Sequence, residues 1–180
     1  MKSKALKLWS ILLTLILVGV GVTFALIARS SHTLNNVFAV GEIEITLTET
    51  TGNQYTLTPG VDIAKDPTVT VKAHSEKCLV FVKAQKSNDF DKYVTFAVAD
   101  GWIKLPSEND VFYREVASSA SDQSIPILSG NQVTVKETVT EEELNAITQK
   151  PKLTFYAYAI QSEGMQNAEY AWNIIKEKEE

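Results

Sequence analysis

The sequence predicts an all-β protein, a β-sandwich or jelly roll, with a short helix near 141–147 and a C-terminal helix. Three observations lead to this prediction. Beyond residue 28, apolar and polar residues alternate over short runs, as in half-buried strands. Turn signals rich in Gly, Pro, Asn and Asp separate these runs roughly every ten residues, as in sandwiches and barrels. A basic and then apolar segment precedes them, which is typical of a signal or transmembrane helix.

The N-terminal segment predicts export. Three lysines within the first seven residues precede an uncharged, apolar run over 8–28. Thr23 and Ala25 suit the pockets of a signal peptidase that cuts after Ala25, and Ala28 is a second possible cut site. The run also approaches the roughly 20 residues of a membrane-spanning helix, so a retained anchor stays open. We therefore expect a secreted or cell-surface protein, or one anchored by this helix and facing outward.

The remainder of the chain is acidic. Three of the 17 basic residues lie before residue 8, so residues 29–180 carry 14 basic side chains against 22 acids, a formal charge of −8. This charge disfavours nucleic acid and anionic membrane surfaces, so we expect membrane contact only through the N-terminal segment before cleavage. Cys78 is the single cysteine, which excludes an intrachain disulfide. A hydrophobic core must therefore stabilise the fold.

The strands follow from alternation. The first is expected over 42–48, where Ile43, Ile45 and Leu47 face one side. Residues 79–82 are apolar on both faces, which predicts a central strand covered on both sides. Two hairpins are expected, one around the loop 106–110 and one around Ser129–Asn131. The remaining predicted strands cover 55–58, 69–71, 94–98, 102–105, 111–116, 125–128, 133–135 and 153–160.

Two helices interrupt the strand pattern. Thr140 and Glu143 form a capping-box sequence, with Leu144 and Ile147 as the apolar edge of the helix that follows. The tail over 167–178 has an apolar face at helical spacing, formed by Ala168, Ala171, Trp172 and Ile175. No internal repeat or long linker divides this region, which predicts one domain after the N-terminal segment.

The residues capable of catalysis are few, and we expect no enzyme activity and no cofactor. His32 follows the apolar run and His74 lies in a predicted turn, without a second histidine at the spacing of a zinc protease. Cys78 heads a strand that is buried on both faces, so an inert thiol is favoured over a nucleophile. The pairs Asp62 with Asp66 and Asp89 with Asp91 are better read as solvated turns than as calcium ligands.

Aromatic residues are the other candidates for a binding site. Trp102 with Tyr113, and Tyr156 with Tyr158, could form a ligand-binding platform, although packing in the core and across strands is the commoner use of such pairs. Exposure of Trp102 and Tyr113 would favour a secreted binding or adhesion module for a glycan or a protein.

Several stretches, taken in order, resemble a known family. They are Gly21–Ala25, Asn36–Glu49, Pro59–Gly60, Lys65–Val69, Ala157–Gln161 and Ala171–Trp172. Together they resemble the alternate signal-mediated exported proteins of Gram-positive bacteria, of clostridial type, which are related to the group of the biofilm fibre protein TasA and the camelysins. Signal peptides of this family are cut by a dedicated signal peptidase. Leu26–Arg29 departs from the aromatic-Thr-Asp segment usual at this place, so Ala25 and Ala28 both remain candidate cut sites.

The resemblance implies a jelly-roll domain with an extracellular, often fibre-forming role. In TasA-like fibres an extended N-terminal segment of one subunit completes the sheet of the next, which is β-augmentation. Here this predicts a signal peptide or anchor at 1–28, an extended arm at 29–37 and a jelly-roll domain at 38–180. The arm and the start of the domain supply the candidate assembly residues Ser30, Ser31, His32, Thr33, Leu34, Asn35, Asn36, Val37 and Phe38.

The leading functional hypothesis is a non-enzymatic surface or matrix protein that assembles as a fibre subunit. Its expected partners are further copies of itself or other matrix and surface proteins, besides the signal peptidase and the secretion machinery. The camelysin relationship implies a metalloendopeptidase, but the sequence has no recognisable set of metal ligands. This activity is therefore the least favoured alternative.

Overall fold

Three β-sheets form the framework of the structure, a computed structural model that describes residues 32–34, 37–40, 42–52 and 55–179. Strands hold 39% and helices 17% of these described residues, which confirms the predicted β class and the C-terminal helix. The predicted signal or anchor at 1–28 lies outside the described residues. Within the described residues, no helix is both long and apolar enough to cross a membrane.

The four-stranded sheet is antiparallel throughout, in the order β1-β3-β5-β10. Its strands are β1 (His32–Leu34), β3 (Ile45–Glu49), β5 (Thr68–Val71) and β10 (Gln123–Pro126). Ile45 pairs with Val71 and Leu47 with Val69, and all four side chains are buried. The alternation predicted for 42–48 and 69–71 is confirmed, because one face of each strand forms the core.

The five-stranded sheet has the order β2-β12-β6-β9-β8. Its strands are β2 (Val37–Val40), β12 (Leu153–Gln161), β6 (Cys78–Lys86), β9 (Val111–Val116) and β8 (Ile103–Lys104). Only the β2–β12 pairing among these is parallel. The predicted hairpin around 106–110 is confirmed as β8 and β9. The centre of the sheet is the antiparallel pair of the two longest strands, β6 and β12.

The third sheet joins β4 (Asp62–Ala64), β11 (Gln132–Val135) and β7 (Val94–Thr95). It shows that the predicted hairpin of 125–128 with 133–135 is wrong. β10 pairs with β5, whereas β11 pairs with β4 and β7. The turn between them is the 3-10 segment Ser129–Asn131, in which Gly130 has a φ of 64°. This left-handed residue turns the chain from one sheet into another instead of back onto itself.

Two other strand predictions need correction. Residues 55–58 are not a strand, although their exposure alternates as predicted. The Tyr55 carbonyl accepts a hydrogen bond from Lys150 Nζ, and the Tyr55 hydroxyl donates to the Pro151 carbonyl. Hydrogen bonds from side chains therefore hold this segment in place, instead of the ladder of backbone hydrogen bonds expected for a strand. The strand predicted at 94–98 ends at Thr95, and Val98 forms only an isolated bridge with Leu128.

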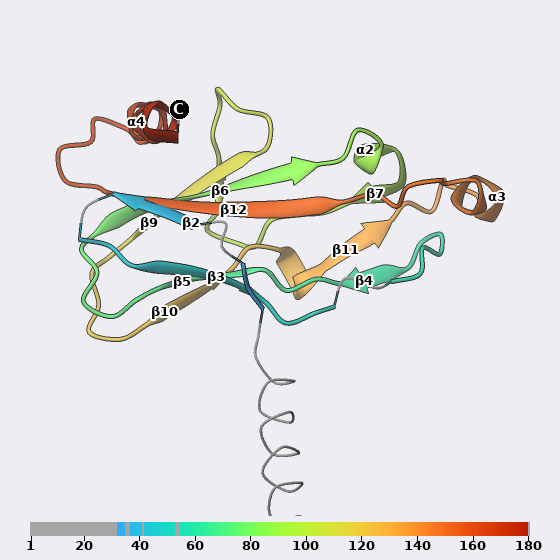
Figure 1. Cartoon of the computed structure of the whole chain (residues 1–180), viewed down its shortest axis with the longest axis horizontal. Helices are drawn as coiled ribbons and strands as arrows, with labels where there is room; N and C mark the ends of the chain where they lie inside the picture. The colour runs from blue at the N-terminus through green and yellow to red at the C-terminus, as the bar shows by residue number, and fades with distance from the viewer. Residues whose placement is uncertain (1–31, 35–36, 41, 53–54, 180) are drawn as a thin grey trace, which may run out of the picture. The chain divides into compact units, whose positions relative to one another are not determined.

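The helices are α2 (Phe90–Tyr93), α3 (Glu141–Asn145) and α4 (Ala168–Glu179). The predicted capping box is present at α3: the Thr140 hydroxyl accepts from the Glu143 amide, and the Thr140 amide donates to the Glu143 carboxylate. α4 lies over the face of the five-stranded sheet that is turned away from β3, β5 and β10 (Figure 1). The short helix α2 was not predicted from the sequence.

Two apolar cores stabilise this arrangement. One lies between the sheets and includes Val80 and Val82 of β6. The other lies beneath α4 and includes Leu79 and Phe81, the alternate residues of the same strand, with Trp172. The predicted central strand covered on both faces is thus confirmed. The Phe81 ring lies 5.4 Å from the ring of Trp172, whose indole N–H donates to Glu108.

Candidate functional site

The predicted assembly arm joins two different sheets. His32–Leu34 forms β1, which pairs with β3 at the edge of the four-stranded sheet. Val37–Val40 forms β2, which pairs with β12 at the edge of the five-stranded sheet. β2 thus ends two residues beyond Phe38, the last of the predicted assembly residues. Ala25, Ala28, Ser30, Ser31, Asn35 and Asn36 lie outside the described residues.

The two N-terminal strands cover edges that lie beside each other. Without β1, β3 would be the edge of its sheet; without β2, β12 would be the edge of the other. β3 lies against both β2 and β12 (Figure 1). A strand at a sheet edge leaves a row of backbone N–H and C=O groups unpaired, which another strand can bind. One short segment thus completes both sheets on the same side.

Side-chain packing holds β2 more loosely than its neighbour β12. Phe38 and Val40 pack against the core beneath α4 but stay half-buried, and Val37 is 37% exposed. In β12, by contrast, Ala157 through Ile160 are all buried. Because buried apolar area is the main source of stability, β2 contributes much less to the fold than the strand it pairs with.

The histidine and cysteine predictions agree with the structure where it describes them. His74 is exposed in a turn, with a left-handed φ of 65°. Cys78 is fully buried, and burial raises the pKa of its thiol to about 11. Such a thiol stays protonated and unreactive at neutral pH. For His32 the structure describes the backbone in β1.

The aspartate pairs serve structural contacts. Asp62 accepts hydrogen bonds from Gln132 and Thr134 on the neighbouring strand β11. Asp66 accepts from the amides and hydroxyls of Thr50 and Thr51 and so fastens the end of β3. Burial alone would raise the pKa of Asp66, but these hydrogen bonds lower it to about 2.

The two aspartates of the second pair, Asp89 and Asp91, differ in their contacts. Asp91 forms an ion pair with Lys86, and the Asp89 side chain makes no capping bond to α2. Across the described residues, no three His, Cys, Asp or Glu side chains gather in a group that could hold a metal ion.

The predicted aromatic platform is not at the surface. Trp102 is 8% exposed, and its indole N–H donates to the Pro126 carbonyl at 2.9 Å. Tyr113 and Tyr156 are half-buried, and Tyr158 is buried with its ring edge-on to Trp172. These residues serve the packing of the sheets, so they do not supply the exposed aromatic surface that would favour a glycan-binding module.

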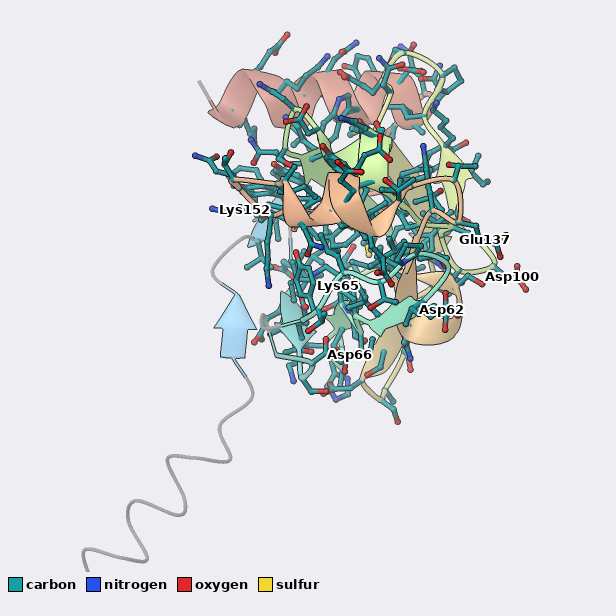
Figure 2. The ribbon with its side chains drawn as sticks, turned by 90° about the vertical axis from the view of Figure 1, so that its right-hand side faces the viewer. Asp62, Lys65, Asp66, Asp100, Glu137 and Lys152 are labelled. Atoms are coloured by element: carbon teal, nitrogen blue, oxygen red, sulfur yellow. The ribbon has the colours of Figure 1, made fainter. Side chains whose placement is uncertain are left out.

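Sequence reasoning missed a cavity at the end of the molecule that carries β4 and β11. It has a volume of about 440 Å³. Its inner wall is apolar and is formed by Ile63, Phe90, Val94, Val133 and Leu153. Its rim carries Glu49, Lys65, Lys150 and Lys152. Figure 2 looks onto this end and labels Lys65 and Lys152. The only sequence signal was the basic run Lys150-Pro151-Lys152, which by itself predicts a helix end.

Comparison with known proteins gives no match for this chain: no protein-family model, no curated protein and no solved structure matches it. The resemblance to the alternate signal-mediated exported proteins therefore stays a prediction.

Proposed function

We propose that this protein is an exported, non-enzymatic structural protein of the cell surface or extracellular matrix. Its fold is a β-sandwich of jelly-roll type, and copies assemble when the N-terminal strands of one subunit pair with the sheets of the next. The single observation that carries the proposal is the double edge pairing: β1 lies on β3, and β2 lies on β12. Export rests on the basic and apolar sequence of the first 28 residues.

Exchange of these strands between copies preserves the pairings. A donated segment forms with the neighbour's β3 and β12 the same backbone hydrogen bonds that it forms in its own chain. The net change is then small, as in domain swapping, and protein concentration decides the balance. β1 has three residues and β2 has four, so few hydrogen bonds break during the exchange. A copy whose own strands are donated presents two open edges to the next copy, so donation in one direction along a row of copies produces a fibre.

Deletion of residues 29–38 tests this function. It removes β1 and the first half of β2, while β6, β12 and the core beneath α4 remain. We expect a folded protein that no longer forms fibres in electron micrographs at concentrations where the intact chain does. A synthetic peptide of residues 30–38 should bind this truncated protein one to one, because the deletion opens the β3 edge and the half of the β12 edge that pairs with Val37 and Phe38.

The matched control is a peptide of the same composition in scrambled order, which should not bind. Circular dichroism establishes that the truncated protein is folded. Fibres formed by the folded truncation would overturn the proposal, as would equal binding of both peptides.

A binding module is the second candidate, and the cavity at the β4–β11 end is the observation that favours it. Sites for small molecules are concave and mostly apolar, with a few polar groups at defined places, and their volumes fall roughly between 300 and 1,000 Å³. The cavity agrees with this description. It adjoins the end of β3, because Glu49 lines the cavity and is the register partner of His32 on β1.

A further inference from the structure

The inner wall of the cavity restricts what can enter it. Phe90, Val94 and Val133 are almost completely buried, and Ile63 and Leu153 are half-buried around them. A hydroxyl-rich ligand such as a sugar would lose its hydrogen bonds to water against these side chains, at a cost of about 1–3 kcal/mol for each unpaired group. The wall therefore favours an apolar ligand body.

Hydrogen bonds close one side of the cavity mouth. The Tyr55 hydroxyl donates to the Pro151 carbonyl at 2.6 Å, and Lys150 Nζ donates to the Tyr55 carbonyl at 2.7 Å. Lys150 Nζ also lies 5.4 Å from the centre of the Tyr55 ring. Burial raises the pKa of Tyr55, so its hydroxyl stays protonated and keeps this bond. Two segments about 95 residues apart in sequence are thus joined beside the entrance.

The rim of the cavity carries more positive than negative charge. Glu49 is the only acid among the described residues that line the cavity, and Lys65 Nζ contacts both of its carboxylate oxygens, at 2.8 and 2.9 Å. In the described part of the chain, Lys152 Nζ has no hydrogen bond and no ion pair, and Lys150 Nζ bonds only to a neutral carbonyl. Two positive charges therefore remain without counter-ions at the mouth of an apolar cavity, in a chain of net charge −5.

We infer that this cavity binds a single-chain amphipathic carboxylate, with its apolar chain against the inner wall and its carboxylate beside Lys152 and Lys150. The apolar body gains from leaving water, and the anionic head supplies the counter-charge that the rim lacks. A cationic amphiphile of equal length would meet the same wall but no unpaired acid. This ligand site goes beyond the proposed assembly and does not depend on it.

The inference is tested by calorimetric titration of the full chain with decanoate. The decanoate concentration is kept below that at which decanoate itself aggregates. We expect one saturable site, and binding of decyltrimethylammonium at least about tenfold weaker. Gly52 lines the cavity, and a Cβ added there meets no atom within 4 Å. Gly52→Phe should therefore place a ring in the mouth without strain and abolish the saturable binding.

Charge reversal gives an independent readout, because Lys152 is exposed and its replacement should leave the fold intact. Lys152→Glu should weaken decanoate binding by about tenfold, since a weak attraction becomes a repulsion of similar size. Lys104→Glu is the matched control, because Lys104 is also exposed but does not line the cavity. It should bind decanoate as the unchanged chain does. Any binding to the apolar N-terminal segment is common to all variants and cancels in the comparison.

Three results would overturn the inference. The first is the absence of saturable decanoate binding. The second is equal binding of the cationic and anionic amphiphiles, which would show that charge at the rim does not matter. The third is the same saturable binding in Gly52→Phe, shown by circular dichroism to be folded, which would place the site elsewhere.

Discussion

The centre of the five-stranded sheet and its N-terminal edge use the same backbone hydrogen bonds but differ in what holds each strand. β6 and β12 pair over nine residues, each has a second strand on its other side, and β6 is covered on both faces. β2 is four residues long, pairs only with β12 and keeps its apolar side chains half-buried. β1 is shorter still and pairs only with β3.

This difference separates the part of the molecule that sets its stability from the part that can be exchanged. Burial on both faces makes β6 and β12 open only when the whole domain unfolds. An edge strand held by one partner opens locally at much lower cost. The proposed assembly needs both properties, because the acceptor sheet must stay folded while the donor strands β1 and β2 detach from it.

Hydrogen exchange should show the largest contrast. Amides of β6 and β12 should exchange only through global unfolding, whereas those of β1 and β2 should exchange about a thousandfold faster or more, through local opening. Exchange measured residue by residue by NMR checks this at a concentration below that of assembly. Equal protection at the edge and in the centre would remove the distinction on which the proposal depends.

Mutation of one phenylalanine in each region compares how much β6 and β2 contribute to stability. Phe81 is fully buried beneath α4, so Phe81→Ala should cost about 3–5 kcal/mol of the free energy of unfolding. Phe38 on β2 is half-buried, so Phe38→Ala should cost about 1 kcal/mol. Denaturant titration of both variants measures the difference. A cost for Phe38→Ala as large as that for Phe81→Ala would mean that β2 is an integral part of the core.

A smaller effect concerns the edge that accepts β1. Asp66 fastens the end of β3 through Thr50 and Thr51, so Asp66→Asn should lower stability by about 1 kcal/mol at neutral pH. The pKa of Asp66 is lowered from 3.8 to about 2 in the folded state, so this stabilisation is present above pH 3.8. It is lost as pH falls toward 2.

The difference in stability between Asp66→Asn and the unchanged chain should therefore shrink between pH 4 and pH 2. Thermal unfolding at several pH values in this window measures it. A difference that stays constant down to pH 2 would show that the Asp66 carboxylate does not carry this charge-dependent contact.

Elements with strong local signals could be predicted from the sequence. Alternation identified β3 and β5, the continuous apolar run identified β6, and the capping box at Thr140 identified α3. In each of these, the residues that determine the structure are close together in the chain. Even the burial of both faces of β6 follows from its own apolar residues.

The errors arise where distant contacts decide. Residues 55–58 alternate like a strand, but Lys150 and Pro151 bind Tyr55 in place of a strand partner. Gly130 directs β11 to β4, which lies about 70 residues earlier, and no local signal distinguishes this from a hairpin. The cavity combines residues from 49 to 154, so it exists only after the sheets have packed.

Strand exchange between copies is tested most directly by disulfide trapping. Thr33 of β1 and Thr48 of β3 are register partners, and facing residues in antiparallel strands have the spacing that a disulfide needs. Two variants are prepared, one with Thr33→Cys and one with Thr48→Cys, then mixed under assembly conditions and oxidised. Cys78 is buried and does not take part. A mixture of Thr33→Cys with Ser124→Cys on β10, which pairs with β5, is the control.

We expect a disulfide between residue 33 of one copy and residue 48 of another in the first mixture, identified by the mass of the linked peptides after proteolysis, and no such cross-link in the control. Such a product requires β1 of one copy to lie on β3 of another. If the first mixture gives no more cross-linking between its two variants than the control while fibres form, assembly does not use the N-terminal strands, and the proposed strand exchange does not occur.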